Sequence, residues 1–164
     1  MRKVLDKLLE IVACFIFIAM LLVCLYQILS RYILKNPSAF SEEFLRFAII
    51  WVSMLGIAYA FGKGSHLAIT FMKDKLNIKE GAIVDLVFHI IFIIFAFFVM
   101  VQGGANAVSI ALYQISPALG IPMGYIYLAL PFSGVITIIY NILNLVDLKS
   151  SLRRNSVNST KVIK

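Results

Sequence analysis

The sequence LLEIVACFIFIAMLLVCLYQIL, residues 8–29, decides the fold class, because it is long and apolar and carries one charged residue, Glu10. A helix of about 20 apolar residues crosses a bilayer core that is about 30 Å thick. Three further stretches, 44–61, 83–101 and 122–146, are similarly apolar. The sequence therefore predicts an all-α integral membrane protein with four transmembrane helices.

The composition supports one membrane domain with little outside the lipid. Of the 164 residues, 62% are hydrophobic and 14% are charged, whereas a soluble domain carries about 25% charged residues. We expect residues 1–148 to form a single four-helix transmembrane domain. Residues 149–164 are polar and basic and are predicted to be a disordered tail.

The basic residues indicate how the helices are oriented. Of the 15 Lys and Arg residues, twelve precede the first stretch, lie between the second and third, or follow the fourth. The other side has Arg31, Lys35 and Arg46, and the connection 103–121 has no charged residue. By the positive-inside rule both termini should be cytoplasmic. The same rule accounts for the net charge of +7, so we do not expect nucleic acid as a partner.

The connections allow short interfacial helices. Asn36 and Pro37 fit a helix cap followed by proline, and Ser41 fits a second helix start. Residues 67–76 mix apolar and basic side chains and are compatible with a helix in the cytoplasmic interface. Gly103 and Gly104 predict a kink or end of the third helix, which leaves open whether residues 105–115 continue it.

Three charged residues, Glu42, Glu43 and Arg46, gather at the entry to the second span. Their spacing of three and four residues places them on one helix face. They are compatible with a helix cap and local ion pair, with a polar contact to another subunit, or with a proton-coupling carboxylate. We keep all three as candidate subunit-interface residues.

Asp85 and His89 are four residues apart inside the third span. Charged groups at such a position are costly unless they are paired or face protein or water. We expect a buried polar pair joined by a mutual hydrogen bond near the cytoplasmic interface. A contact to a partner chain or a proton relay stays open as an alternative.

The second span also carries small residues on one side, which permit close approach of another helix. Aromatic residues near the ends of apolar stretches are typical of interfacial anchors. The candidate interface residues are Ser53, Gly56 and Ala60, and the candidate anchors are Trp51, Tyr125 and Tyr127.

The sequence shows no motif for enzymatic chemistry. It lacks a phosphate-binding glycine loop, a His-Glu-x-x-His motif and a nucleophile elbow. His66 and His89 could in principle ligate a haem, but His66 lies in a glycine-bearing connection between spans. We therefore predict neither an enzyme nor a bound cofactor or metal.

Several short motifs, taken in order, resemble the small membrane subunit of TRAP (tripartite ATP-independent periplasmic) transporters, the DctQ-like family. Together they cover most of residues 31–134. In the first half they are Arg31-Tyr32, Asn36-Pro37-Ser38, Ser41-Glu42-Glu43-x-x-Arg46, Trp51, Gly56 and Gly64-x-His66-Leu-Ala-Ile. The second half matches through Ser116-Pro-Ala-Leu-Gly120-Ile-Pro122-x-Gly-Tyr-Ile-Tyr127-Leu-Ala-Leu-Pro131-x-Ser-Gly134.

This resemblance implies a role in the bacterial inner membrane. TRAP systems are sodium-driven secondary importers of organic acids such as sialic acid or C4-dicarboxylates. A periplasmic protein binds the substrate and a large multi-span subunit moves it, so sodium coupling is expected in the large subunit. The small subunit would scaffold the large one as a multi-pass membrane protein in contact with lipid.

Two other functions are compatible with four apolar helices. One is a haem- or quinone-anchoring subunit of a membrane oxidoreductase. The other is a small self-contained exporter. An absorption spectrum of the purified protein would separate the first from the transporter subunit, and transport by the chain alone would identify the second.

Overall fold

The structure is a computed structural model that describes residues 2–63 and 78–162. All its regular elements are helices, and four long apolar helices are candidate membrane spans: Arg2–Tyr32, Ala39–Lys63, Ile83–Ala111 and Gly124–Lys149. The predicted helical fold class and the number of apolar helices are thus confirmed. The elements are α1 (Arg2–Tyr32), α2 (Ala39–Lys63), α4 (Ile78–Phe95), η1 (Ala96–Gly103), α5 (Gly104–Ala111), α6 (Gly124–Tyr127) and α7 (Ala129–Val162).

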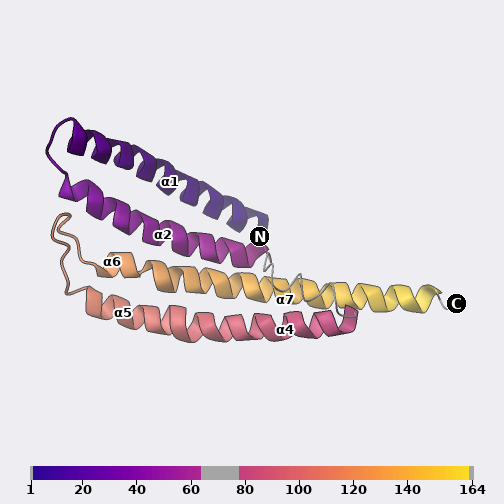
Figure 1. Ribbon diagram of the computed structural model, residues 1–164. Helices are drawn as coiled ribbons and strands as arrows, with labels where there is room; N and C mark the ends of the chain where they lie inside the picture. Colours follow the sequence, from indigo (N-terminus) through magenta and orange to yellow (C-terminus); the bar gives the residue numbers. More distant parts are fainter. Residues whose placement is uncertain (1, 64–77, 163–164) are drawn as a thin grey trace.

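The helices pack as an open row (Figure 1). α2 packs between α1 and α7, and α7 packs between α2 and the continuous α4–η1–α5 rod. In the part of the chain that the structure describes, α1 and α4 make no extensive contact with each other. The row leaves most of α1 exposed, which an apolar helix tolerates where lipid surrounds it.

The centre of the row is an apolar cluster shared by three helices. It joins Leu9 of α1, Leu55 and Ala58 of α2, and Ile136 and Tyr140 of α7. Tyr140 is fully buried. This cluster fixes α2 between its two neighbours.

A close approach beside this cluster depends on a glycine. A Cβ atom added to Gly62 would lie 2.6 Å from the Tyr140 ring. A side chain at that position would therefore push α2 away from α7.

The third span is longer than the sequence predicts. A π-helical segment, Ala96–Gly103, is followed directly by α5, so the glycine pair does not end the helix and residues 104–111 continue it. The sequence left open whether residues 105–115 continue the helix, and in the structure it continues to Ala111. A Cβ on Gly104 would lie 2.8 Å from Pro131 Cδ, and one on Gly134 would lie 2.7 Å from Met100 Cβ. These glycines thus bring the rod and α7 together.

The second span begins without a separate interfacial helix. α2 starts at Ala39, and the Ser38 hydroxyl accepts a hydrogen bond from the backbone N–H of Ser41 at 3.4 Å. The predicted cap at Asn36 is wrong, because that residue turns back toward α1. Its backbone N–H donates to the Ser30 carbonyl at 3.1 Å, and the Ser30 hydroxyl donates to its carbonyl.

The fourth span also differs from the prediction at both ends. Pro122 forms an isolated bridge with Ile115, and helix begins only at Gly124. α7 continues to Val162, where the sequence predicts a disordered tail after Lys149. Residues 149–162 contain neither glycine nor proline, so they hold no strong helix breaker. The expected interfacial segment 67–76 and His66 lie outside the described residues.

Candidate functional site

Glu43 lies in the first turns of α2 and its side chain is buried. Its Oε2 atom accepts hydrogen bonds from the backbone N–H groups of Ala118 at 2.9 Å and Leu119 at 2.8 Å. Both donors belong to the connection between α5 and α6. A charged acceptor bound by two backbone donors is a strong arrangement, so Glu43 ties α2 to this connection.

The connection itself, residues 112–123, is a tight hairpin, which we call the loop-end hairpin. Ser116 N–H donates to the Ile121 carbonyl at 2.9 Å, and Gly120 N–H donates to the Ser116 carbonyl at 3.0 Å. Gly120 has a φ of 66°, a conformation that favours glycine. The turn therefore presents its N–H groups to Glu43 in a fixed geometry.

Glu42 and Arg46 point away from this contact. They form an ion pair at 3.2 Å, and about two thirds of each side chain is exposed. The predicted three-residue cluster is thus divided into one buried carboxylate and one exposed pair. Sequence reasoning did not identify the partners of Glu43, because they are backbone groups more than 70 residues away.

The predicted small-residue face of α2 faces away from the other helices. Ser53, Gly56 and Ala60 are exposed. A Cβ added to Gly56 would meet no atom within 4 Å. This face is therefore open to another chain, unlike Gly62 and Gly104, which contact neighbouring helices.

The three predicted anchors lie in different settings. Tyr125 and Tyr127 belong to α6 and are exposed at the end of the row that carries the loop-end hairpin. Trp51 lies midway along α2 and its ring centroid is 6.1 Å from that of Phe132 on α7. The position of Trp51 favours packing between helices over an interfacial role.

His89 makes a polar contact across the row. Its Nδ1 lies 2.7 Å from Oδ1 of Asn141 on α7, and Asn141 is fully buried. The Asn141 amide donates to the Thr137 carbonyl at 2.9 Å. The hydrogen bond that the structure gives to His89 thus runs to α7, while Asp85 is buried one turn earlier on α4.

Sequence reasoning missed Asn141. The available signal was an amide among apolar residues in the last third of the predicted span 122–146, where a polar group needs a partner.

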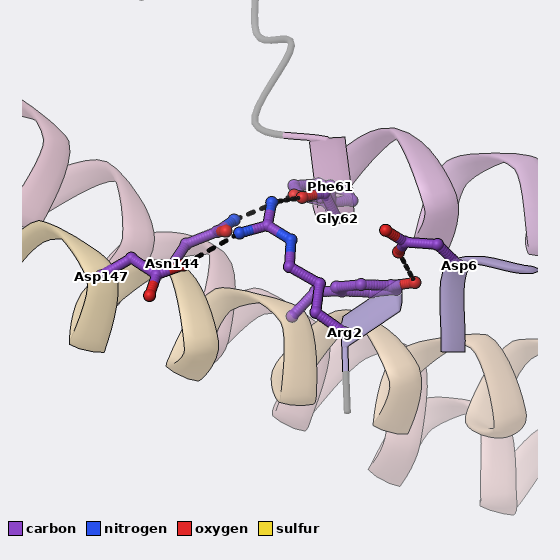
Figure 2. A network of polar contacts seen from close by, with 7 residues as sticks. Arg2, Asp6, Phe61, Gly62, Asn144 and Asp147 are labelled. Carbon is purple, nitrogen blue, oxygen red and sulfur yellow. Dashed lines mark hydrogen bonds and ion pairs between the residues drawn. The ribbon is translucent and has the colours of Figure 1, made fainter. Parts of the chain in front are cut away.

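A second polar network lies at the opposite end of the row, where α1 begins and α2 ends (Figure 2). Arg2 of α1 donates to the Gly62 carbonyl and forms an ion pair with Asp147 of α7 at 3.0 Å. The Asn144 amide donates to the Phe61 carbonyl at 3.1 Å. Side chains from two helices thus satisfy carbonyls that the last turn of α2 leaves unbonded.

The same end of the row joins α1 to its neighbours by further polar contacts. The hydroxyl of Tyr140 donates to Asp6 at 2.5 Å, and that of Tyr59 donates to Glu10 at 2.5 Å. The Nζ atom of Lys63 lies 4.0 Å from Oε1 of Glu10. These contacts hold the start of α1 in place.

An apolar groove of about 430 Å³ lies toward the hairpin end of the row. α1, α2, the loop-end hairpin and α6 line it. Aromatic side chains such as Phe15, Phe47 and Trp51 form much of its wall. Over the described residues, no group of three or more His, Cys, Asp or Glu side chains could hold a metal ion.

Comparison with protein families gives a match over most of the chain. Residues 20–150 match the model of the DctQ component of tripartite ATP-independent periplasmic transporters. The matched range includes the second, third and fourth apolar helices and the last part of the first, from residue 20. It also includes the contacts around Glu43 and His89.

Curated relatives agree with the family match. The chain is 31% identical over 135 residues to the sialic acid TRAP transporter small permease protein SiaQ of Vibrio cholerae, covering 82% of this chain and 78% of the relative. It is 29% identical over 133 residues to a putative TRAP transporter small permease protein of Haemophilus influenzae, covering 81% and 80%.

Two longer relatives contain the matched region as part of a larger permease. The chain is 30% identical over 138 residues to the sialic acid TRAP transporter permease protein SiaT of Haemophilus influenzae, of which it covers 22%. It is 29% identical over 112 residues to the isethionate TRAP transporter permease protein DctMQ of Oleidesulfovibrio alaskensis, of which it covers 18%. Such fusions support association with the large TRAP subunit. The chain belongs to the DctQ family of TRAP transporter small permease subunits, a family of multi-pass cytoplasmic-membrane transporter components and not of enzymes.

Proposed function

We propose that this chain braces the large permease subunit of a sodium-driven TRAP importer. The observation that carries the proposal is the open small-residue face of α2, formed by Ser53, Gly56 and Ala60. In membranes such faces let helix backbones approach closely, and packing of this kind drives association where no hydrophobic effect operates. A helix of the large subunit is the expected occupant.

The exposed pair Glu42–Arg46 extends this proposed interface toward the hairpin end. Glu43 is excluded from it, because its Oε2 already binds the loop-end hairpin. In our proposal Glu43 has a positioning role, since it holds the hairpin against the start of α2. The periplasmic substrate-binding protein would then meet a fixed surface at this end of the row.

We infer that the substrate is an organic acid. The relatives include transporters named for sialic acid and for isethionate, and both compounds are organic acids. C4-dicarboxylates are a third candidate. The substrate site and the sodium site are expected on the partner subunits.

We propose that both termini are cytoplasmic. The end of the row with Arg2, Lys3, Lys7 and Lys63 carries more basic residues than the hairpin end, as the positive-inside rule requires of the cytoplasmic side. Reporter fusions after Lys164 and within the loop-end hairpin test this orientation. Periplasmic activity of the reporter after Lys164 would contradict it.

Co-purification with the large permease subunit tests the proposed interface. Gly56→Leu fills the open face of α2 and should reduce recovery of the complex at least about tenfold, which corresponds to about 1.4 kcal/mol. Cys14→Leu is the matched control, because Cys14 is an exposed residue of α1. Neither change should destabilise the chain alone. Equal recovery of the Gly56→Leu variant and the parent would place the interface elsewhere.

A further inference from the structure

The hydrogen-bond roles around Asn141 place a proton on Nδ1 of His89. The Asn141 amide nitrogen donates to the Thr137 carbonyl at 2.9 Å, so its Oδ1 is the atom that faces His89. An amide oxygen only accepts hydrogen bonds. The Nδ1 atom of His89, 2.7 Å away, must therefore carry the proton.

In the neutral imidazole, this assignment leaves the second ring nitrogen, Nε2, as an acceptor. A neutral imidazole has one N–H group, so Nε2 of His89 presents a lone pair. Among the described residues, the hydrogen bond that the structure gives to His89 is the one through Nδ1. In the part of the chain that the structure describes, Thr137 Oγ1 is the one fully buried side-chain atom that lacks a hydrogen-bond partner. Nε2 of His89 is not in that class, and the His89 side chain is half-buried, so Nε2 is accessible from outside the chain.

The lone pair lies within an apolar segment of the third span. His89 is six residues beyond Ile83, where the apolar span begins, and thus about 9 Å along the helix. Exposed neighbours on α4 are apolar, as at Leu86 and Ile90. A polar atom in such surroundings costs free energy unless a partner satisfies it.

We propose that Nε2 of His89 accepts a hydrogen bond from a side chain of the large permease subunit, on a helix that packs along α4. The inference rests on the proposed function, which supplies a large apolar partner in the same membrane. The partner group must be a donor, such as a hydroxyl, amide or indole N–H, within an otherwise apolar helix face. Lipid acyl chains carry no donor and cannot fill this role.

Two substitutions separate the proposed contact of Nε2 with the large subunit from the contact of Nδ1 with Asn141. Asn at position 89 places an amide N–H where Nδ1 lies, so it keeps a donor toward Asn141 but has nothing at the position of Nε2. Gln at position 89 carries its polar group farther out, near the position of Nε2, and gives up the donor toward Asn141. If His89 has a purely internal role, His89→Gln should impair recovery of the complex more than His89→Asn does. If Nε2 contacts the large subunit, His89→Asn should impair that recovery more.

The experiment measures thermal unfolding of each variant alone in detergent and its recovery with the large subunit. His89→Asn should unfold like the parent yet lose recovery of the complex about tenfold. His89→Gln should unfold at a lower temperature, while its folded fraction is recovered within about threefold of the parent. The proposal is overturned if His89→Asn is recovered like the parent, or if recovery of both variants falls only in proportion to their unfolding.

The outcome is separable from that of the proposed function. If the parent chain itself does not co-purify with the large subunit, the proposed function fails and this contact fails with it. If the parent co-purifies and Gly56→Leu abolishes recovery while His89→Asn does not, the brace role holds and the contact at His89 is wrong.

Discussion

The Oε2 atom of Glu43 lies 2.8 Å from the backbone nitrogen of Leu119, a residue 76 positions later in the chain. It also accepts a hydrogen bond from the backbone N–H of Ala118, so one carboxylate binds two adjacent backbone donors of a turn. The start of the second span and the connection between the third and fourth are therefore joined outside the apolar core.

Replacing Glu43 with Ala should destabilise the chain by about 1.5–3 kcal/mol, because two backbone N–H groups of the loop-end hairpin lose a charged acceptor. Glu42→Ala is the control and should cost about 0.3–0.5 kcal/mol, because it removes only an exposed pair within one helix. Unfolding in detergent measures both values. Hydrogen exchange should rise at Ala118 and Leu119 in the Glu43→Ala variant alone, and unchanged exchange there would contradict the assigned contact.

Gly62 and Gly56 should respond in opposite ways to the same change. Gly62→Ala places a Cβ 2.6 Å from the Tyr140 ring and should cost about 1–3 kcal/mol through overpacking. Gly56→Ala meets open space and should leave the stability of the isolated chain unchanged or slightly higher. Thermal unfolding of the two purified variants decides between these outcomes, and equal loss of stability would show that α2 is rotated from its assigned position.

Thr137→Val should stabilise the chain or leave its stability unchanged. The Thr137 hydroxyl is enclosed and has no hydrogen-bond partner among the described residues, and an unsatisfied buried hydroxyl costs about 1–3 kcal/mol. Valine has nearly the same shape without that group. A clear loss of stability in detergent would show instead that the hydroxyl has a partner.

Arg2→Gln should destabilise the attachment of α1 by about 0.5–1.5 kcal/mol, because it removes the guanidinium that donates to the Gly62 carbonyl and pairs with Asp147. Lys3→Gln removes the same charge from an exposed neighbour and serves as the control. Protease sensitivity near the start of α1 and unfolding in detergent report the difference. Identical behaviour of the two variants would mean that Arg2 acts only through its charge.

The number of apolar helices could be predicted from the sequence, because length and hydropathy alone decide whether a segment can span a bilayer. Their order in space could not. Lipid-facing and helix-facing positions are both apolar, so Phe15 on the exposed side of α1 and Leu55 in the central cluster have the same signature. The row α1–α2–α7–α4 therefore appears only in the structure.

The helix boundaries expected from the sequence differ from those in the structure where local propensity and tertiary packing compete. Gly103 and Gly104 are weak helix formers, yet Gly104 lies under Pro131, and that packing accompanies a helix that continues to Ala111. Charge spacing identified Glu42 with Arg46, because partners on one helix face follow from the sequence. It could not identify Leu119 or Asn141, because long-range hydrogen bonds leave no local pattern.

Uptake by proteoliposomes tests the central claim most directly. The large permease subunit, this chain, the periplasmic binding protein and a labelled organic acid are combined under an inward sodium gradient, and each membrane subunit is also tested alone. We predict uptake only when both membrane subunits are present. Uptake by this chain alone, or equal uptake by the large subunit without it, would contradict the brace role.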